Sequence, residues 1–207
     1  MEEQWNQAVL VLGGTPNDAA ADLTRRYEEP HRLYHNTSHV LAVLRAAREI
    51  ADVTSREWAI LTLAICAHDV IYDARPGDDE RASAAWARTQ LSSSGVAAHH
   101  VEQVASLVLA TLGHQSDDPL AHVLLDADLS ILGSAPEVYD AYAVAVRAEY
   151  SAVSESSWRQ GRSKVLRSLL DRADLFRTPQ AISRWDALAR ENLRRELSTL
   201  REDSPKS

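Results

Sequence analysis

Residues 58–71 read Trp-Ala-Ile-Leu-Thr-Leu-Ala-Ile-Cys-Ala-His-Asp-Val-Ile, an almost wholly apolar segment that ends on a histidine and an aspartate. Its apolar residues point in nearly every direction when they are placed on a helix: Trp58, Ile60, Leu61, Leu63, Ile65, Val70 and Ile71. A helix of this kind is buried on most of its faces. The segment therefore predicts a central helix that opens at Ser55 and carries His68 and Asp69 near its end.

Capping residues and turn signals divide the rest of the chain into further helices. We expect helices over 2–12, from Asn17 or Asp18 to Pro30, from a cap at Thr37 or Ser38 onward, and over 79–92, 97–112, 119–132, 136–150, 156–173 and 179–202. No segment keeps the alternation of a β-strand for long enough to build a sheet. The predicted fold class is all-α.

Composition narrows the class of protein. A length of 207 residues suits one domain, and 45% apolar with 25% charged residues is ordinary for a globular protein. The lone Cys66 excludes an intrachain disulfide, and neither a signal-like start nor a membrane-length apolar run is present, so we expect a cytoplasmic protein. A net charge of −8 without a basic cluster argues against nucleic-acid or membrane partners. An anionic substrate would then need a local cation, such as a bound metal.

Three apolar segments contain ionisable side chains. His68 and Asp69 end the central segment, His39 falls in the first turn of an apolar helix, and Asp126 and Asp128 interrupt another apolar run. Aspartate is almost never fully buried unless it is paired or binds a metal. Both side chains of the 68–69 pair can converge only on something that lies between helices.

Each of these residues also has an ordinary structural explanation. His39 could be a hydrogen-bonded core histidine, Asp69 could pair with an arginine, and Asp126 or Asp128 could cap a helix. Two histidines and at least two aspartates from three apolar helices nevertheless favour a metal site. The pattern alone leaves open whether Asp126 or Asp128 belongs to it.

The order of these residues resembles the HD superfamily of metal-dependent phosphohydrolases: a histidine, a His-Asp pair 29 residues later (39 to 68), and an aspartate 59 residues beyond the pair (69 to 128). The short sequence motifs around these residues resemble one bacterial branch of that superfamily. They are Tyr-His-Asn-Thr-Ser-His-Val (34–40), Ala-His-Asp-Val-Ile-Tyr-Asp (67–73), Glu-Arg-Ala-Ser-Ala (80–84), Ala-Thr-Leu-Gly-His (110–114) and Leu-Leu-Asp-Ala-Asp-Leu-Ser-Ile-Leu-Gly (124–133). The resemblance covers about residues 30–195.

The resemblance implies a helical bundle with a metal between its central helices, bound by His39, His68, Asp69 and Asp128. Asp128 is preferred to Asp126 because in many HD proteins the ligand stands in an Ala-Asp-x-Leu-like setting, which here reads Ala127-Asp128-Leu129-Ser130. Such ligands suit one divalent ion: Mn, Fe, Co, Ni or Zn, with Mg less favoured. The expected single HD-type domain spans 1–203, with a metal-binding core over about 30–135, C-terminal helices over about 136–202 and a tail at 204–207.

The implied activity is hydrolysis of a small phosphate ester such as a nucleotide, with Asp69 and Glu80 as catalytic residues. Glu80 would orient the attacking water, or it is an ordinary acid in the first turn of a helix. Candidate substrate-binding residues, each of which could instead have a surface role, are His35, His114, Arg147, Arg162 and Lys164. A homodimer is compatible with this interpretation.

Two alternatives remain open. The first is an HD-type di-iron oxygenase, which needs histidines beyond the four-residue set, and His35 and His114 are the available ones. The second is a non-catalytic HD module that binds a nucleotide. Iron content and oxygen dependence would identify the former, and nucleotide binding without metal would identify the latter.

Overall fold

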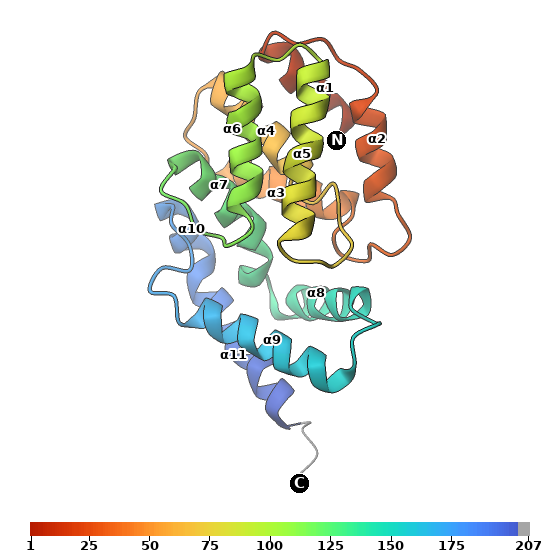
Figure 1. The fold of residues 1–207 in the computed structure, drawn as a ribbon. Coiled ribbons are helices and arrows are strands. Elements are labelled where there is room, and N and C mark those ends of the chain that lie inside the picture. The colour runs from red at the N-terminus through yellow and green to blue at the C-terminus, as the bar shows by residue number, and fades with distance from the viewer. Residues whose placement is uncertain (203–207) are drawn as a thin grey trace.

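A computed structural model describes residues 1–202, which form helices with no strand among them and so confirm the all-α prediction (Figure 1). The predicted tail at 204–207 lies outside the described residues. In chain order the α-helices are α1 (Glu2–Val11), α2 (Ala19–Tyr27), α3 (Thr37–Ile50), α4 (Ser55–Ala67), α5 (Asp78–Ser93), α6 (Ala98–Ala110), α7 (Pro119–Asp128), α8 (Pro136–Glu149), α9 (Glu155–Leu170), α10 (Pro179–Ala181) and α11 (Ala187–Glu202). No helix of this part of the chain is both long and apolar enough to cross a bilayer.

The apolar segment forms α4, which lies at the centre of the molecule. All residues from Ala59 to Ala67 are buried, and α4 packs against α1, α3, α5, α6 and α7. Its start is fixed by a capping box, because the Thr54 hydroxyl accepts the Glu57 backbone N–H while the Glu57 carboxylate accepts the Thr54 N–H. The predicted start at Ser55 is therefore confirmed, with Thr54 as its cap.

The end of α4 differs from the apolar pattern, which runs on to Ile71. The helix stops at Ala67, and His68 and Asp69 lie in the turn after it. Arg32, whose side chain is fully buried, donates to the backbone carbonyls of Asp69 (2.6 Å) and Val70 (3.0 Å). Because the guanidinium satisfies these carbonyls, the chain can leave the helix without burying unpaired acceptors. The central helix is thus shorter than its apolar sequence suggests.

The cap of α3 also differs from the prediction. Asn36 is the capping residue, and its side-chain oxygen accepts the backbone N–H groups of Ser38 (2.9 Å) and His39 (3.4 Å). Thr37 is already the first helical residue, so neither Thr37 nor Ser38 caps the helix. Asparagine performs this role as well as serine does. The consequence is that His39 stands in the first turn of α3, as expected.

Two predicted helices change geometry near their ends. The segment expected over 119–132 is α7 followed by a 3₁₀ turn, η1 (Leu129–Gly133), so the α-helix ends at Asp128. The segment expected over 179–202 contains a π-helical turn, η2 (Ile182–Asp186), between α10 and α11. The backbones of η1 and η2 lie against each other.

The C-terminal helices form a layer of their own. In Figure 1, α8, α9 and α11 lie across the ends of the helices that surround α4. The α11 helix contacts α9 and η1, and the buried Asn192 of α11 donates to the backbone carbonyls of Leu132 and Ser134 (both 2.9 Å). These bonds hold η1, and with it the end of α7, in a defined position.

Gly133 provides a test of this packing. A Cβ atom at Gly133 would lie 2.5 Å from the Trp185 Cβ and 2.8 Å from the Trp185 backbone. Because backbone cannot give way as a flexible side chain does, we expect Gly133→Ala to lower the free energy of unfolding by about 1–3 kcal/mol. Urea unfolding monitored by circular dichroism measures this. Gly161→Ala is the control, since no atom lies within 4 Å of its added Cβ, and an equal loss in both variants would contradict the prediction.

Candidate metal centre

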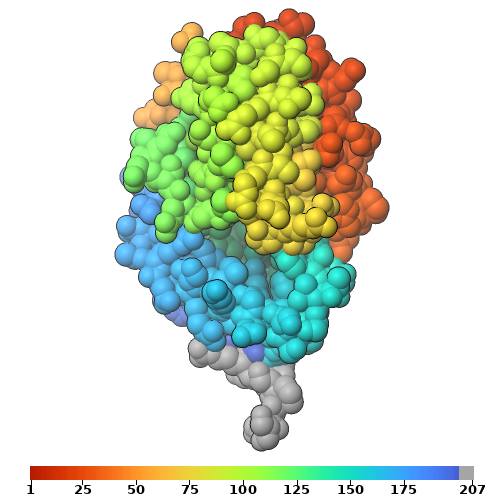
Figure 2. All heavy atoms as spheres, viewed as in Figure 1, coloured from red at the N-terminus to blue at the C-terminus, as the bar shows by residue number. Residues whose placement is uncertain are grey.

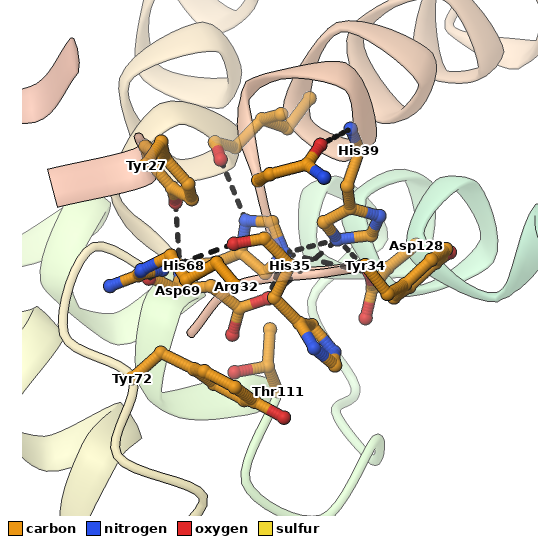
Figure 3. Close-up of polar contacts among 12 residues, drawn as sticks. Tyr27, Arg32, Tyr34, His35, His39, His68, Asp69, Tyr72, Thr111 and Asp128 are labelled. Atoms are coloured by element: carbon orange, nitrogen blue, oxygen red, sulfur yellow. Dashed lines mark hydrogen bonds and ion pairs between the residues drawn. The ribbon is translucent and has the colours of Figure 1, made fainter. Parts of the chain in front are cut away.

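Four ionisable side chains, from two helices and one turn, converge at one point (Figure 3). His39 comes from α3, His68 and Asp69 from the turn after α4, and Asp128 from the end of α7. The Nε2 atoms of His39 and His68 lie 3.1 Å apart. The Asp69 Oδ2 atom lies 3.1 Å from His68 Nε2 and 3.6 Å from His39 Nε2. The Asp128 Oδ1 atom lies 3.3 Å from His39 Nε2 and 3.5 Å from His68 Nε2.

The orientation of His68 is set by its other ring nitrogen. Nδ1 lies 2.7 Å from the backbone carbonyl oxygen of Ile65, so Nδ1 carries the proton and donates it. A neutral imidazole in this tautomer presents a lone pair on Nε2, the atom that faces the cluster. A backbone carbonyl behind a ligating histidine is the usual arrangement in protein metal sites. His68 is thus prepared to bind a cation through Nε2.

The cluster concentrates negative charge in a buried place. Burial opposes ionisation of Asp69, but the neighbouring His68 outweighs it and lowers the pKa of the carboxyl below its usual range. Burial likewise opposes ionisation of Asp128, whose pKa is lowered by hydrogen bonds from His114, His39 and His68. For His68, burial disfavours the charged ring, yet Asp69 and Asp128 raise its pKa well above the ordinary value. The two ionised carboxylates thus stabilise a positive charge between them. The extra proton on His68 can supply that charge, and a metal ion would compete with this proton for the site.

The donor set fits a divalent metal ion. One nitrogen or oxygen atom from each of His39, His68 and Asp69 lies within 4.8 Å of the others, and both histidines are buried. Ligands at about 2.1 Å from an ion and about 90–110° apart are separated by about 3.0–3.4 Å, close to the spacings of this cluster. Imidazole and carboxylate together suit the transition metals of the first row. This His39–His68–Asp69 group could therefore hold a metal ion.

The two aspartates of α7 have different surroundings. Asp128 directs its carboxylate at the histidines, whereas Asp126 is 1% exposed and faces the connection before α10. The Asp126 carboxylate accepts the backbone N–H groups of Arg177 (2.9 Å) and Thr178 (2.7 Å) and the Thr178 hydroxyl (2.7 Å). Residues two apart on a helix point about 200° apart, so only one of them can face the cluster. Asp128 is the one that does.

His114, a predicted substrate-binding residue, lies at the edge of the cluster. Its Nε2 atom is 3.1 Å from the Asp128 Oδ2 atom, and its side chain is 28% exposed. The backbone of His114 is left-handed (φ 49°), a conformation uncommon for residues other than glycine. The Arg172 guanidinium donates to the carbonyls of Gly113 (3.3 Å) and His114 (3.4 Å) and supports this turn.

A cavity of about 810 Å³ adjoins the cluster, and all four converging side chains line it. Figure 2 shows the molecule hollowed between the yellow and green residues of α5 and α6 and the cyan to blue residues of α8 and α9. The volume falls within the range of small-molecule sites. Several aromatic rings line the cavity: Tyr34, Tyr72, Tyr142, Tyr150 and Trp158.

The other predicted substrate-binding residues have varied surroundings. His35 lines the cavity and stacks on Tyr72, with ring centroids 4.3 Å apart. Lys164 also lines it and is exposed. Arg162 lines the cavity too, but Glu196 accepts from it at 2.7 and 2.9 Å. Arg147 is not brought to the cavity, because it binds the Glu155 carboxylate and two backbone carbonyls at the turn between α8 and α9.

Glu80, the predicted catalytic acid, lines the cavity at the start of α5. Its Oε2 atom accepts the Gly77 backbone N–H at 2.5 Å, and Gly77 has a left-handed backbone (φ 93°). The neighbouring Asp79 accepts the N–H groups of Asp73 (3.1 Å) and Arg75 (2.7 Å). These two acids shape the loop after the His68–Asp69 turn, so Glu80 has a structural role whether or not it meets a substrate.

Glu149 of α8 is a residue whose role the sequence did not reveal. Its Oε1 atom accepts the backbone N–H groups of Leu33 (2.8 Å), Tyr34 (2.7 Å) and His35 (3.0 Å). Its Oε2 atom lies 2.6 Å from His35 Nδ1 and accepts the Tyr72 hydroxyl at 2.9 Å. One carboxylate thus ties the loop before α3 to the C-terminal layer across more than 110 residues of chain. An acid in the last turn of a helix carries no local signal of such a role.

Comparison of the chain with protein-family models, with curated proteins and with solved structures finds no match in any of the three. The function of the protein must therefore be inferred from its own residues and their geometry.

Proposed function

We propose that this protein is a metal-dependent phosphohydrolase that acts on a small phosphate ester, as the resemblance of its motifs to the HD superfamily implies. The observation that carries the proposal is the convergence of two imidazole nitrogens and two carboxylates beside a cavity of about 810 Å³. A cluster that only stabilised the fold would not require an adjoining cavity. A pocket for an apolar ligand would not require buried charged groups. The four residues that the resemblance implies as ligands lie close together, which supports the proposal.

In this proposal His39, His68, Asp69 and Asp128 hold one divalent ion. The ion, when bound, supplies positive charge for the phosphoryl oxygens and lowers the pKa of a bound water. The chain's own residues prepare the site, since the Ile65 carbonyl fixes the His68 tautomer and the Tyr27 hydroxyl accepts the Asp69 backbone N–H (3.2 Å). Glu80, which lines the same cavity, is proposed to orient the attacking water or to take its proton.

The cavity walls support an ester whose leaving group contains a flat ring, such as a nucleotide. Tyr34 and Tyr142 meet edge to face with centroids 4.7 Å apart, and Tyr150 and Trp158 add two further aromatic rings to the lining. Aromatic rings stack on nucleobases regardless of base identity. The proposal extends to the class of substrate only.

The di-iron oxygenase differs from this proposal in the number of metal ions bound. A second metal would need further ligands, and His35 and His114 are the candidates. His114 contacts Asp128, and Glu149 engages the Nδ1 atom of His35 at 2.6 Å, which leaves the Nε2 atom of His35 to act as a ligand. The number of metal ions per chain therefore distinguishes the two functions.

The test is a paired measurement of metal content and phosphate release. The purified protein is analysed by elemental mass spectrometry and then screened against nucleotides and aryl phosphates with added Mn, Co, Ni, Zn or Mg. We expect about one metal per chain, release of phosphate from at least one ester, loss of release after treatment with a chelator and recovery when the metal is restored. A protein with two irons per chain and no phosphate release would favour the oxygenase, and a metal-free protein would refute the proposal.

A further inference from the structure

A second hollow adjoins the cavity of the candidate metal centre. Its volume is about 610 Å³, and it lies along the C-terminal half of α9 and the connection after α6. The hollow and the cavity share four lining residues, Gly113, Lys164, Ser168 and Arg172. The two spaces therefore lie next to each other, on either side of these shared residues.

The hollow carries positive charge that the protein does not neutralise. Lys164 and Arg167 are exposed side chains of α9, and neither forms an ion pair with the described side chains of residues 1–200. Arg172 donates to the backbone carbonyls of Gly113 and His114, and burial together with the nearby Arg177 lowers its pKa. Among the lining residues in the described chain, Asp171 is the acid, so three cations face one carboxylate.

This surplus contrasts with the rest of the molecule, whose net charge is −8. Arg162, which also lines the cavity, is by contrast paired with Glu196. Cations of like charge that share a hollow repel one another unless an anion lies between them. A cluster left without acidic partners beside a ligand cavity is suited to receive an anion from the ligand.

We propose that Lys164, Arg167 and Arg172 form a second anion-binding subsite, so that the substrate is a small molecule with two separated anionic groups. One group is the phosphate at the candidate metal centre, and the other is a phosphate or carboxylate held in the hollow. Arginine and lysine bind such groups through charge-assisted hydrogen bonds. This inference rests on the proposed function for the identity of the first group, but not for the binding of the second.

Arg172 also connects the subsite to the metal centre. It holds the carbonyls of Gly113 and His114, and the His114 ring contacts Asp128. A substitution of Arg172 would therefore disturb both places. Lys164 and Arg167 have no such structural contacts, which makes them the residues to change.

The test compares ligands that carry one or two phosphates. Calorimetric titration of the metal-loaded protein, residues 1–207, uses alkanediol bisphosphates, from butane- to decanediol, and the alkyl monophosphates of equal length. Three proteins are compared: the wild type, Lys164→Gln/Arg167→Gln, and the control Arg56→Gln/Arg194→Gln, which has the same charge change at exposed positions outside the hollow and the cavity. Phosphate release is followed in parallel.

We expect a bisphosphate of suitable length to bind the wild type more tightly than its monophosphate. The Lys164→Gln/Arg167→Gln variant should weaken that bisphosphate roughly tenfold and the monophosphate less than about twofold, as befits two partly exposed charge contacts. The control variant should bind both ligands as the wild type does.

Other outcomes separate this inference from the proposed function. If no bisphosphate of any length is preferred, or if the variant weakens both ligands equally, the second subsite is refuted even when phosphate is released. If the preference exists and the variant loses it while no ester is hydrolysed, the subsite stands and the phosphohydrolase proposal falls.

Discussion

Asp128→Asn is expected to lose bound metal and to lower phosphohydrolase activity roughly a thousandfold. The Asp128 carboxylate contacts three histidines at 3.1–3.5 Å: His39, His68 and His114. An amide keeps the shape of the side chain but removes the negative charge, and its NH₂ group cannot accept from a ring N–H or bind a cation. Metal per chain by elemental mass spectrometry, together with phosphate release, measures both effects.

Asp126→Asn is the matched control, because it makes the same chemical change two residues away on the same helix. The Asp126 carboxylate is occupied by Arg177 and Thr178, so this variant should keep its metal. It should lose about 1–3 kcal/mol of unfolding free energy through weakened buried hydrogen bonds. Loss of metal in Asp126→Asn with retention in Asp128→Asn would reverse the assignment of the fourth ligand.

Glu149→Gln is expected to produce the largest loss of stability, roughly 3 kcal/mol at neutral pH. Burial would raise the pKa of Glu149, but the His35 hydrogen bond and charge and the backbone N–H groups of Tyr34 and His35 outweigh it and lower the pKa to about 2 from 4.5. The folded state therefore favours the ionised carboxylate, whose side chain is 1% exposed. Glutamine keeps one acceptor oxygen but places an NH₂ group where His35 and Tyr72 require an acceptor.

The dependence on pH distinguishes this effect from a loss of packing. Because the folded-state pKa is the lower one, the contribution of Glu149 is fully present above about pH 4.5 and is lost as the pH falls toward 2. Urea unfolding at pH 7 and pH 3 should show a difference between wild type and Glu149→Gln that shrinks in acid. Glu137→Gln, in the first turn of the same helix, should cost under about 1 kcal/mol. A difference that is the same at both pH values would show that the charge of Glu149 is not what stabilises the loop.

Local sequence patterns predicted most of the helices. The end of α4 was predicted wrongly because a residue far away in the sequence contacts the chain there. The end of α4 was misplaced because Arg32, 37 residues before Asp69, satisfies the carbonyls of Asp69 and Val70 in the turn that follows the helix. An apolar pattern predicts which residues are buried but not where a helix ends. Val70 is buried although it lies outside the helix. The cap of α3 was misplaced by one residue because asparagine, threonine and serine stand side by side, and local sequence does not rank such neighbours.

In the candidate site, too, the sequence predicted some of the residues, and the tertiary structure was needed to place the others. Residue order was enough to predict the fold class and to mark His39, His68 and Asp69, because a charged or titratable side chain within an apolar helix needs a buried partner. Three-dimensional packing was needed to show that Asp128 faces the histidines while Asp126 faces Thr178, that Arg147 lies away from the cavity, and that Glu149 organises the loop before α3. These choices depend on which helix faces meet, and helix packing is set by contacts between segments far apart in the chain. The spacing of residues along one segment carries no record of those contacts.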